Sequence, residues 1–237
     1  MKETGGARRA FGEALPYTLP IFAGFWFVGA GYGLYMHSAG FPFWYPMMMA
    51  MIIFGGSLEF ITVSMLLSPF APVQTALVAL VVQARHLFYG LSMMEKYEGT
   101  GWKKPFLIFW MCDETFALNY TATVPRGVDR GWFYFWVSFL DYAYWVSGAL
   151  MGGIAGTLLS DFSMTGMSFV MTTMFVVIFL EQLLKEKSAA TAVTGIAVSG
   201  VSLAFFGADS FMMPALLGIL FVLTVLRGWI GKRGEYE

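Results

Sequence analysis

The stretch Gln83-Ala84-Arg85-His86-Leu87-Phe88-Tyr89-Gly90 is a polar segment inside an apolar run that extends from Pro72 to Met94. This run of 23 residues is long enough to cross a bilayer as a helix. The helical rise places Arg85 roughly 20 Å from the start of the run, near mid-membrane. Because a guanidinium at that depth costs several kcal/mol unless it is paired or hydrated, we expect Arg85 to have a function. On a helix Tyr89 shares a face with Arg85, whereas His86 lies about 100° around it.

The composition is that of a membrane protein. The chain is 58% hydrophobic and only 12% charged, with a mean hydropathy of +0.67, so a soluble domain of this length is excluded. The net charge of −1 gives no indication of nucleic-acid binding. Cys112 is the only cysteine, which excludes intrachain disulfides and C-x-x-C metal sites. We expect neither a metal nor another cofactor.

Apolar stretches predict an all-α, polytopic transmembrane helical bundle of about eight spans, with one or more broken helices. The stretches are residues 14–36, 42–67, 72–94, 105–123, 131–158, 164–184, 188–206 and 210–230. They form a single predicted transporter domain, 14–230, between a short cytoplasmic lead, 1–13, and a short cytoplasmic tail, 231–237. Arg8-Arg9 raises the alternative of a twin-arginine export signal, but the apolar run that follows is too long and lacks a clear cleavage site.

Loop charges indicate the orientation of the chain in the cell membrane. With eight spans and both termini in the cytoplasm, ten of the 14 lysines and arginines fall on the cytoplasmic side. Lys96, Lys103 and Lys104 fall outside and are the exception, and Arg85 lies within a span. The conflict would be explained if one early stretch were re-entrant.

Two spans are rich in small residues. In the first span these are Gly24, Gly29, Gly31 and Gly33, and in the fifth they are Gly148, Gly152, Gly153 and Gly156. In both spans the pattern favours close helix packing. For the first span, a helix that unwinds beside a substrate is the alternative.

Gly55-Gly56, followed by Glu59, is the best candidate for a broken helix. Paired glycines permit a break whose freed backbone groups can meet a polar ligand. Glu59 would then be a buried carboxylate at the site, with a structural pairing to another span as the alternative. The methionines that precede this pair indicate flexible packing rather than a soft-metal site.

Asp113 and Glu114 place two adjacent acids near mid-depth in the fourth stretch. They point about 100° apart on a helix, so both cannot serve one partner equally. One is expected to pair with Arg85, and the other to bind a substrate ammonium or carry a proton. Bracing a neighbouring helix is the alternative for Glu114. Asp141, in the fifth span, is interpreted as a brace, with a role as a site residue as the alternative.

An enzyme is the less favoured class. The sequence contains neither G-x-S-x-G nor H-E-x-x-H. One alternative is an intramembrane aspartyl hydrolase that uses Asp141 and Asp209, but their flanking residues do not match the usual pattern. A pore is also disfavoured, because the buried charges are few and of both signs. Charges of both signs at mid-depth suit a zwitterion such as an amino acid.

Three motifs carry a family resemblance. They are Arg85-His86-Leu87-Phe88-Tyr89-Gly90, Asp113-Glu114-Thr115-Phe116-Ala117-Leu118 and Thr172-Thr173-Met174-Phe175-Val176-Val177. With these motifs the chain resembles the AzlC family, the large subunits of branched-chain amino acid exporters. The resemblance implies export of branched-chain amino acids, L-valine among them, with a small AzlD-type membrane subunit as partner. A membrane subunit that carries no substrate itself is the runner-up.

The predicted site lies between spans two, three and four. Arg85 either anchors a substrate carboxylate or forms the central ion pair, with Asp113, Glu114 and Glu59 as the acidic members. The predicted cavity-lining residues are His86, Tyr89, Gly55, Gly56 and Asn119.

Overall fold

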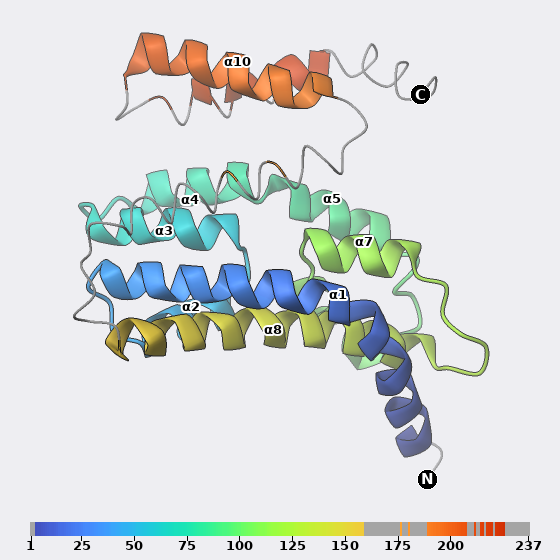
Figure 1. Cartoon of the computed structure of the whole chain (residues 1–237). Coiled ribbons are helices and arrows are strands. Elements are labelled where there is room, and N and C mark those ends of the chain that lie inside the picture. Colours follow the sequence, from blue (N-terminus) through green and yellow to red (C-terminus); the bar gives the residue numbers. More distant parts are fainter. Residues whose placement is uncertain are drawn as a thin grey trace. The chain divides into compact units, whose positions relative to one another are not determined.

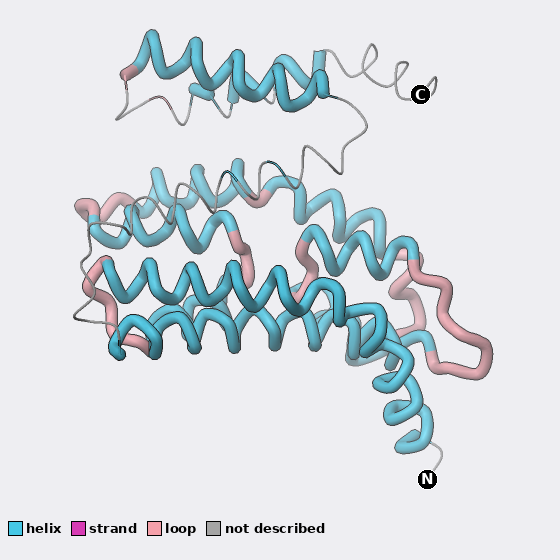
Figure 2. The backbone as a smooth tube through the Cα atoms, in the orientation of Figure 1, coloured by secondary structure: helices cyan, strands magenta, loops and turns pink. Residues whose placement is uncertain are grey.

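The computed structural model describes residues 3–158 and 189–207, Val176, Leu180 and Phe211, and residues 214–215, 217–219 and 221–225. These residues are helical or lie in turns and loops, which confirms the all-α prediction for the described part (Figure 2). Asp209, most of the predicted span 164–184, the Thr172–Val177 motif except Val176, and the tail 231–237 lie outside the described residues.

The described residues divide between two compact units, Met1–Ala71 with Gln83–Met171, and Pro72–Val82 with Thr172–Glu237. The helices of the first unit are α1 (Glu3–Ser38), α2 (Trp44–Ile53), α3 (Ser57–Leu67), α5 (Ala84–Met93), the short 3-10 helix η1 (Gly101–Lys103), α6 (Lys104–Phe109), α7 (Asp113–Thr121) and α8 (Arg130–Leu158) (Figure 1). Those of the second unit are α4 (Pro72–Val82) and α10 (Ala189–Phe206).

Three of the predicted spans are broken into shorter helices. The break at Gly55-Gly56 is confirmed, since α2 ends at Ile53 and α3 begins at Ser57. The prediction of one continuous helix over 72–94 is wrong, because Gln83 leaves the helical region at φ −98° and ψ 8°. The stretch 105–123 is also interrupted, between α6 and α7. Arg85 and Asp113 therefore lie in the first turns of short helices rather than in the middle of long ones.

Only one described helix, over Gly6–Ser38, is both long and apolar enough to cross a membrane by itself. The pair Pro72–Val82 and Ala84–Met93 meets the same requirement when the two are counted together. The prediction of eight spans is therefore not confirmed. Several predicted spans are not counted because they are divided into helices of half the required length. The 29-residue helix α8 is not counted because its tyrosines, tryptophans and glycines lower its mean hydropathy.

Helices α1 and α8 pack directly against each other through glycine (Figure 1). A Cβ atom added at Gly148 would lie 2.6 Å from the carbonyl oxygen of Trp26, and one at Gly29 would lie 2.9 Å from that of Trp145. Gly33 and Gly152 leave equally little room, against the backbones of Ala149 and Ala30. The packing interpretation is confirmed for these four glycines, whereas a Cβ atom at Gly24 would have no heavy atom within 4 Å. Helix α1 stays helical throughout its length.

The predicted N-terminal lead belongs to this packed body. Helix α1 begins at Glu3, eleven residues before the predicted span, and Ala10 is fully buried. The indole nitrogen of Trp136 donates to the carbonyl oxygen of Ala7 at 2.9 Å. The start of α1 thus lies beside the first turns of α8.

Helices α6 and α7 form a hairpin that starts and ends beside the first turn of α8. Before α6, the Lys103 ammonium lies 4.4 Å from the centroid of the Trp132 ring. After α7 has run back, the carbonyl oxygen of Tyr120 accepts a hydrogen bond of 2.5 Å from Lys96, and Arg130 donates to the Lys96 carbonyl at 3.5 Å. We call α6–α7 the second hairpin, and this end of the unit the basic end.

Helices α2 and α3 form the first hairpin, which extends from the opposite end. The backbone of Phe43, just before α2, lies against Gly153 near the end of α8. In α3 the Phe60 ring lies 5.3 Å from Tyr32 and 6.2 Å from Tyr35, near the end of α1, so α3 runs back to the end from which α2 came.

The tips of the two hairpins meet beside the middle of α8. The ring of Tyr142 lies 5.1 Å from Phe54 at the tip of the first hairpin and 5.3 Å from Trp110 at the tip of the second. Its hydroxyl donates to the carbonyl oxygen of Met51 at 3.1 Å. One residue of α8 therefore contacts two breaks that lie 56 residues apart in the sequence.

Candidate functional site

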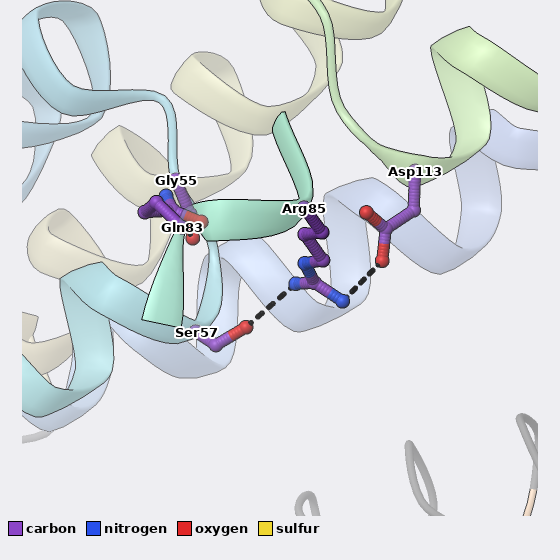
Figure 3. Close-up of polar contacts among 5 residues, drawn as sticks. All are labelled: Gly55, Ser57, Gln83, Arg85 and Asp113. Carbon is purple, nitrogen blue, oxygen red and sulfur yellow. Dashed lines mark hydrogen bonds and ion pairs between the residues drawn. The ribbon is translucent and has the colours of Figure 1, made fainter. Parts of the chain in front are cut away.

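Arg85 lies between the two hairpin tips and contacts both. Its Nη1 pairs with Asp113 Oδ2 at 2.6 Å, and its Nη2 donates to Ser57 Oγ at 3.1 Å (Figure 3). The predicted pairing of Arg85 with one of the two adjacent acids is confirmed, and that acid is Asp113. The side chains of the pair are 36% and 29% exposed, so the pair is only partly shielded.

The break at Gln83 is fastened to the break in the first hairpin. The side-chain amide of Gln83 donates to the carbonyl oxygen of Gly55 at 3.1 Å (Figure 3). A Cβ atom at Gly55 would collide with that amide nitrogen, so only glycine allows this approach. The next residue, Gly56, has a φ of +45°, which favours glycine for a second reason. Gly55 and Gly56 thus shape the site through their backbones.

Helices α3 and α7 begin in equivalent ways around Arg85. The first residue of each, Ser57 or Asp113, contacts the guanidinium. The third residue of each bonds to α8, where Glu59 accepts from Trp145 and Thr115 donates to Asp141. Trp145 lies four residues after Asp141, on the same face of α8. Helix α5 also begins here, so the positive ends of three helix dipoles converge near Arg85.

Four buried polar atoms in this region have no protein hydrogen-bond partner. They are Gln83 Oε1, Arg85 Nε, His86 Nδ1 and Asp113 Oδ1. Buried polar groups are normally satisfied, so a group of unfilled donors and acceptors around a partly exposed ion pair fits a site for a polar ligand. It offers a donor for a carboxylate and acceptors for an ammonium.

Tyr89 and His86 lie next to this pair, as predicted for α5. The Tyr89 ring stacks on Phe116 of α7, with centroids 4.5 Å apart, and the His86 ring lies 5.7 Å from that of Tyr89. Glu114, the second residue of α7, is half-buried. The rings of Tyr89 and Phe116 provide an apolar wall between α5 and α7.

Two predicted site residues have structural partners instead. Glu59 is fully buried, and its carboxylate accepts from the Trp145 indole at 3.0 Å on both oxygens and from the Gly55 amide at 2.9 Å. It therefore fastens the first hairpin to α8 rather than pairing with Arg85. Asn119 is also fully buried and donates to Tyr97 and Ser138, which gives it a structural role, and its place in a cavity lining stays a prediction.

Asp141 is placed as the brace that the sequence predicts. Its Oδ2 accepts from Thr115 of α7 at 2.8 Å, deep inside the first unit. Because Asp209 lies outside the described residues, the aspartyl-pair alternative stays a hypothesis. In the part of the chain that the structure describes, no group of three or more His, Cys, Asp and Glu side chains is placed to hold a metal ion.

Comparison with known proteins shows the family to which the chain belongs. The model of the AzlC protein family matches residues 20–159. The "Branched-chain amino acid transport protein AzlC" of Bacillus subtilis is 54% identical over 92% of this chain and 85% of its own length. An "Uncharacterized membrane protein" of Haemophilus influenzae is 44% identical over 89% and 86%, and the "Inner membrane protein YgaZ" of Escherichia coli is 26% identical over 81% and 82%. No solved structure is significantly similar.

Short opposed helices around a partly exposed ion pair, in a chain whose relatives are membrane proteins, define the class as a membrane transport protein. More particularly, the chain belongs to the AzlC family. Ser57, Gln83 and Trp145 complete the arrangement. The sequence patterns assign no role in the site to Ser57 and Trp145, and they place Gln83 in the polar segment without indicating that the helix breaks there.

Proposed function

We propose that this protein exports branched-chain amino acids such as L-valine across the cytoplasmic membrane, together with a small AzlD-type membrane subunit. Residues 14–230 form the transporter domain. The B. subtilis relative is named for branched-chain amino acid transport, and the E. coli relative is named as an inner membrane protein. The observation that carries the proposal is the Arg85–Asp113 pair at the junction of the two hairpins.

The substrate binds by inserting its charged groups at this pair. The carboxylate is held by Arg85 and favoured by the converging starts of α3, α5 and α7. The ammonium is held by Asp113, with Gln83 Oε1 as a further acceptor. The two unfilled atoms Arg85 Nε and Asp113 Oδ1 support this assignment, because a zwitterion satisfies both. Tyr89 and Phe116 offer the apolar side chain its wall.

A membrane topology with two re-entrant hairpins follows from the fold of the first unit. The start of α1, the segment before α6, the segment after α7 and the start of α8 share the basic end. We infer that α1 and α8 cross the membrane and that the first and second hairpins enter it from opposite sides. Irregular backbone at membrane depth then lines the site, as it does in transporters with broken helices.

This topology resolves the conflict in the loop charges. Lys96, Lys103 and Lys104 move to the side of Arg9 and Arg130, which is the cytoplasm under the positive-inside rule. With the three C-terminal apolar stretches as crossings, every lysine and arginine except Arg85 is cytoplasmic, and so are both termini. Six crossings and two re-entrant hairpins replace the eight spans expected from hydropathy.

The sidedness of two loops tests this topology. In a Cys112→Ser background, we expect a membrane-impermeant maleimide added to intact cells to label Ser68→Cys but not Glu98→Cys. The segment after α3 returns to the outer face, whereas Glu98 lies beside Lys96 at the basic end. A topology of eight simple crossings instead places position 68 in the cytoplasm and position 98 outside the cell.

Arg126→Cys is the matched control, since both arrangements place it in the cytoplasm, and it should react only after the cells are permeabilised. Labelling of Glu98→Cys in intact cells, with Ser68→Cys protected, contradicts the re-entrant hairpins.

Transport itself is tested in vesicles that contain the purified protein, with and without the small subunit. We expect labelled L-valine to enter vesicles preloaded with unlabelled valine, leucine or isoleucine, and not those preloaded with lysine. Entry that does not depend on the preloaded amino acid contradicts the proposed function.

A further inference from the structure

A second polar centre lies one layer deeper than the Arg85 pair, where α7 packs on α8. Asp141 is fully buried in the middle of α8, and one of its carboxyl oxygens accepts a hydrogen bond of 2.8 Å from the Thr115 hydroxyl. Its other oxygen, Oδ1, is buried with no hydrogen-bond partner. A carboxylate with one neutral donor and one empty oxygen is poorly stabilised as an anion.

Glu59 shows how a carboxylate with hydrogen bonds to both of its oxygens is held in the same protein. It is as deeply buried, but N–H groups of Trp145 and Gly55 donate to it and both of its oxygens are satisfied. N–H groups can only donate, so this arrangement suits the charged form. The surroundings of Asp141 differ, because a hydroxyl can turn to donate or to accept and Oδ1 is left open.

Asp141 is also linked mechanically to the substrate site. Thr115, its partner, is the third residue of α7, and the first residue of that helix is Asp113, which holds Arg85. The Thr115 hydroxyl also lies 3.1 Å from the Cys112 thiol. A movement of the α7 start at the substrate site is therefore transmitted to Asp141 within one helical turn.

We propose that Asp141 is the proton-binding residue of the transport cycle. It takes a proton from one side and releases it to the other, in exchange for the exported amino acid. The inference rests on the proposed export, since inward proton flow can drive a solute outward only if the two are exchanged. Protonation removes the buried charge, and a protonated Asp141 keeps α7 docked on α8.

The neighbouring groups are consistent with a proton rather than a metal cation. Among the described residues, the titratable groups that interact electrostatically with Asp141 are the Cys112 thiol and the Glu114 carboxyl, both at the start of α7. A sodium ion would need several oxygen ligands, whereas Asp141 is provided with one hydroxyl.

The test compares wild-type protein with Asp141→Asn in vesicles that hold the complete transporter. With an about tenfold proton gradient and one proton exchanged per valine, wild-type vesicles should accumulate valine about tenfold on the acidic side. Asp141→Asn should show a ratio of about one. Glu98→Gln is the control, because it neutralises an exposed acid outside both polar centres and should keep the gradient response.

The inference is overturned if vesicles with the Asp141→Asn variant accumulate valine to the wild-type ratio. It is also overturned if wild-type vesicles accumulate valine in response to a sodium gradient and not to a proton gradient. If the Asp141→Asn variant does not exchange valine, a second measurement is needed. Protons released or taken up when valine binds are then measured for the wild type and the variant with a pH dye in weakly buffered detergent solution. The inference is supported if the Asp141→Asn variant binds valine without the proton signal of the wild type. It is overturned if the variant gives the wild-type proton signal, or if the variant is folded but binds no valine. Absence of valine exchange by the wild type overturns the proposed function instead.

Discussion

Replacing Arg85 with alanine should abolish valine export while the protein still reaches the membrane. The change removes the carboxylate anchor and leaves Asp113 as a partly buried acid without its partner. Loss of one member of such a pair costs roughly 2–3 kcal/mol, which corresponds to an about 30-fold to 150-fold loss in transport. The measurement is valine efflux from preloaded cells, normalised to the amount of protein in the membrane fraction.

Ser57→Ala is the matched control for this variant. It removes the weaker contact of Arg85, a hydrogen bond of 3.1 Å, but keeps the ion pair and the helix start. We expect it to reduce efflux by less than about tenfold, in line with one hydrogen bond of about 1 kcal/mol. If the Arg85→Ala variant still exports valine at the wild-type rate, the proposed role of Arg85 as the carboxylate anchor is wrong.

Substitution of Gly152 by alanine should give the largest loss of stability among single-methyl changes. The added Cβ would collide with the carbonyl oxygen of Ala30, so the backbones of α1 and α8 would have to separate. Overpacking of this kind costs about 2–3 kcal/mol and should lower the apparent Tm by ~5–10 °C. Thermal unfolding of the purified protein in detergent measures the shift.

Gly24→Ala in the neighbouring helix adds the same methyl group where no heavy atom lies within 4 Å. Because alanine is the better helix former, its apparent Tm should stay unchanged or rise slightly. An equal fall of the Tm in both variants contradicts the close packing of α1 on α8.

The sequence allowed the helical class, the pairing of Arg85 with one of two adjacent acids, and the glycine packing to be predicted. Each leaves a strong local signal: an arginine in an apolar run, acids at similar depth in another stretch, and small residues at helical spacing. Gly55-Gly56 gave the position of one break for the same reason. The pairing of Asp113 rather than Glu114 required the structure, because the two acids are adjacent in the sequence and either could face Arg85.

Under the proposed topology, hydropathy overestimates the number of crossings. Two half-length helices that run out and back contain as many apolar residues as one full span, so each hairpin resembles a crossing. The break before Asp113 has neither glycine nor proline, and the break at Gln83 is held by a hydrogen bond to Gly55, 28 residues away. Lys96, Lys103 and Lys104 were the one signal in the sequence that pointed to re-entrant segments.

Glu59 and Asn119 were assigned to the site because they are polar residues in apolar stretches. The structure gives each a partner on the opposite side of its helix from Arg85: Trp145 for Glu59, and Tyr97 and Ser138 for Asn119. A buried polar residue is satisfied by whichever helix packs on its face, and the sequence does not identify that helix.

The central claim is that the Arg85–Asp113 pair recognises both charged groups of an amino acid. The most direct measurement is competition for labelled L-valine binding to the purified protein. We predict that L-leucine and L-isoleucine compete, whereas isovalerate, which lacks the ammonium, and valinamide, which lacks the carboxylate, do not. Competition by either single-charge analogue as strong as that of unlabelled L-valine would contradict the account.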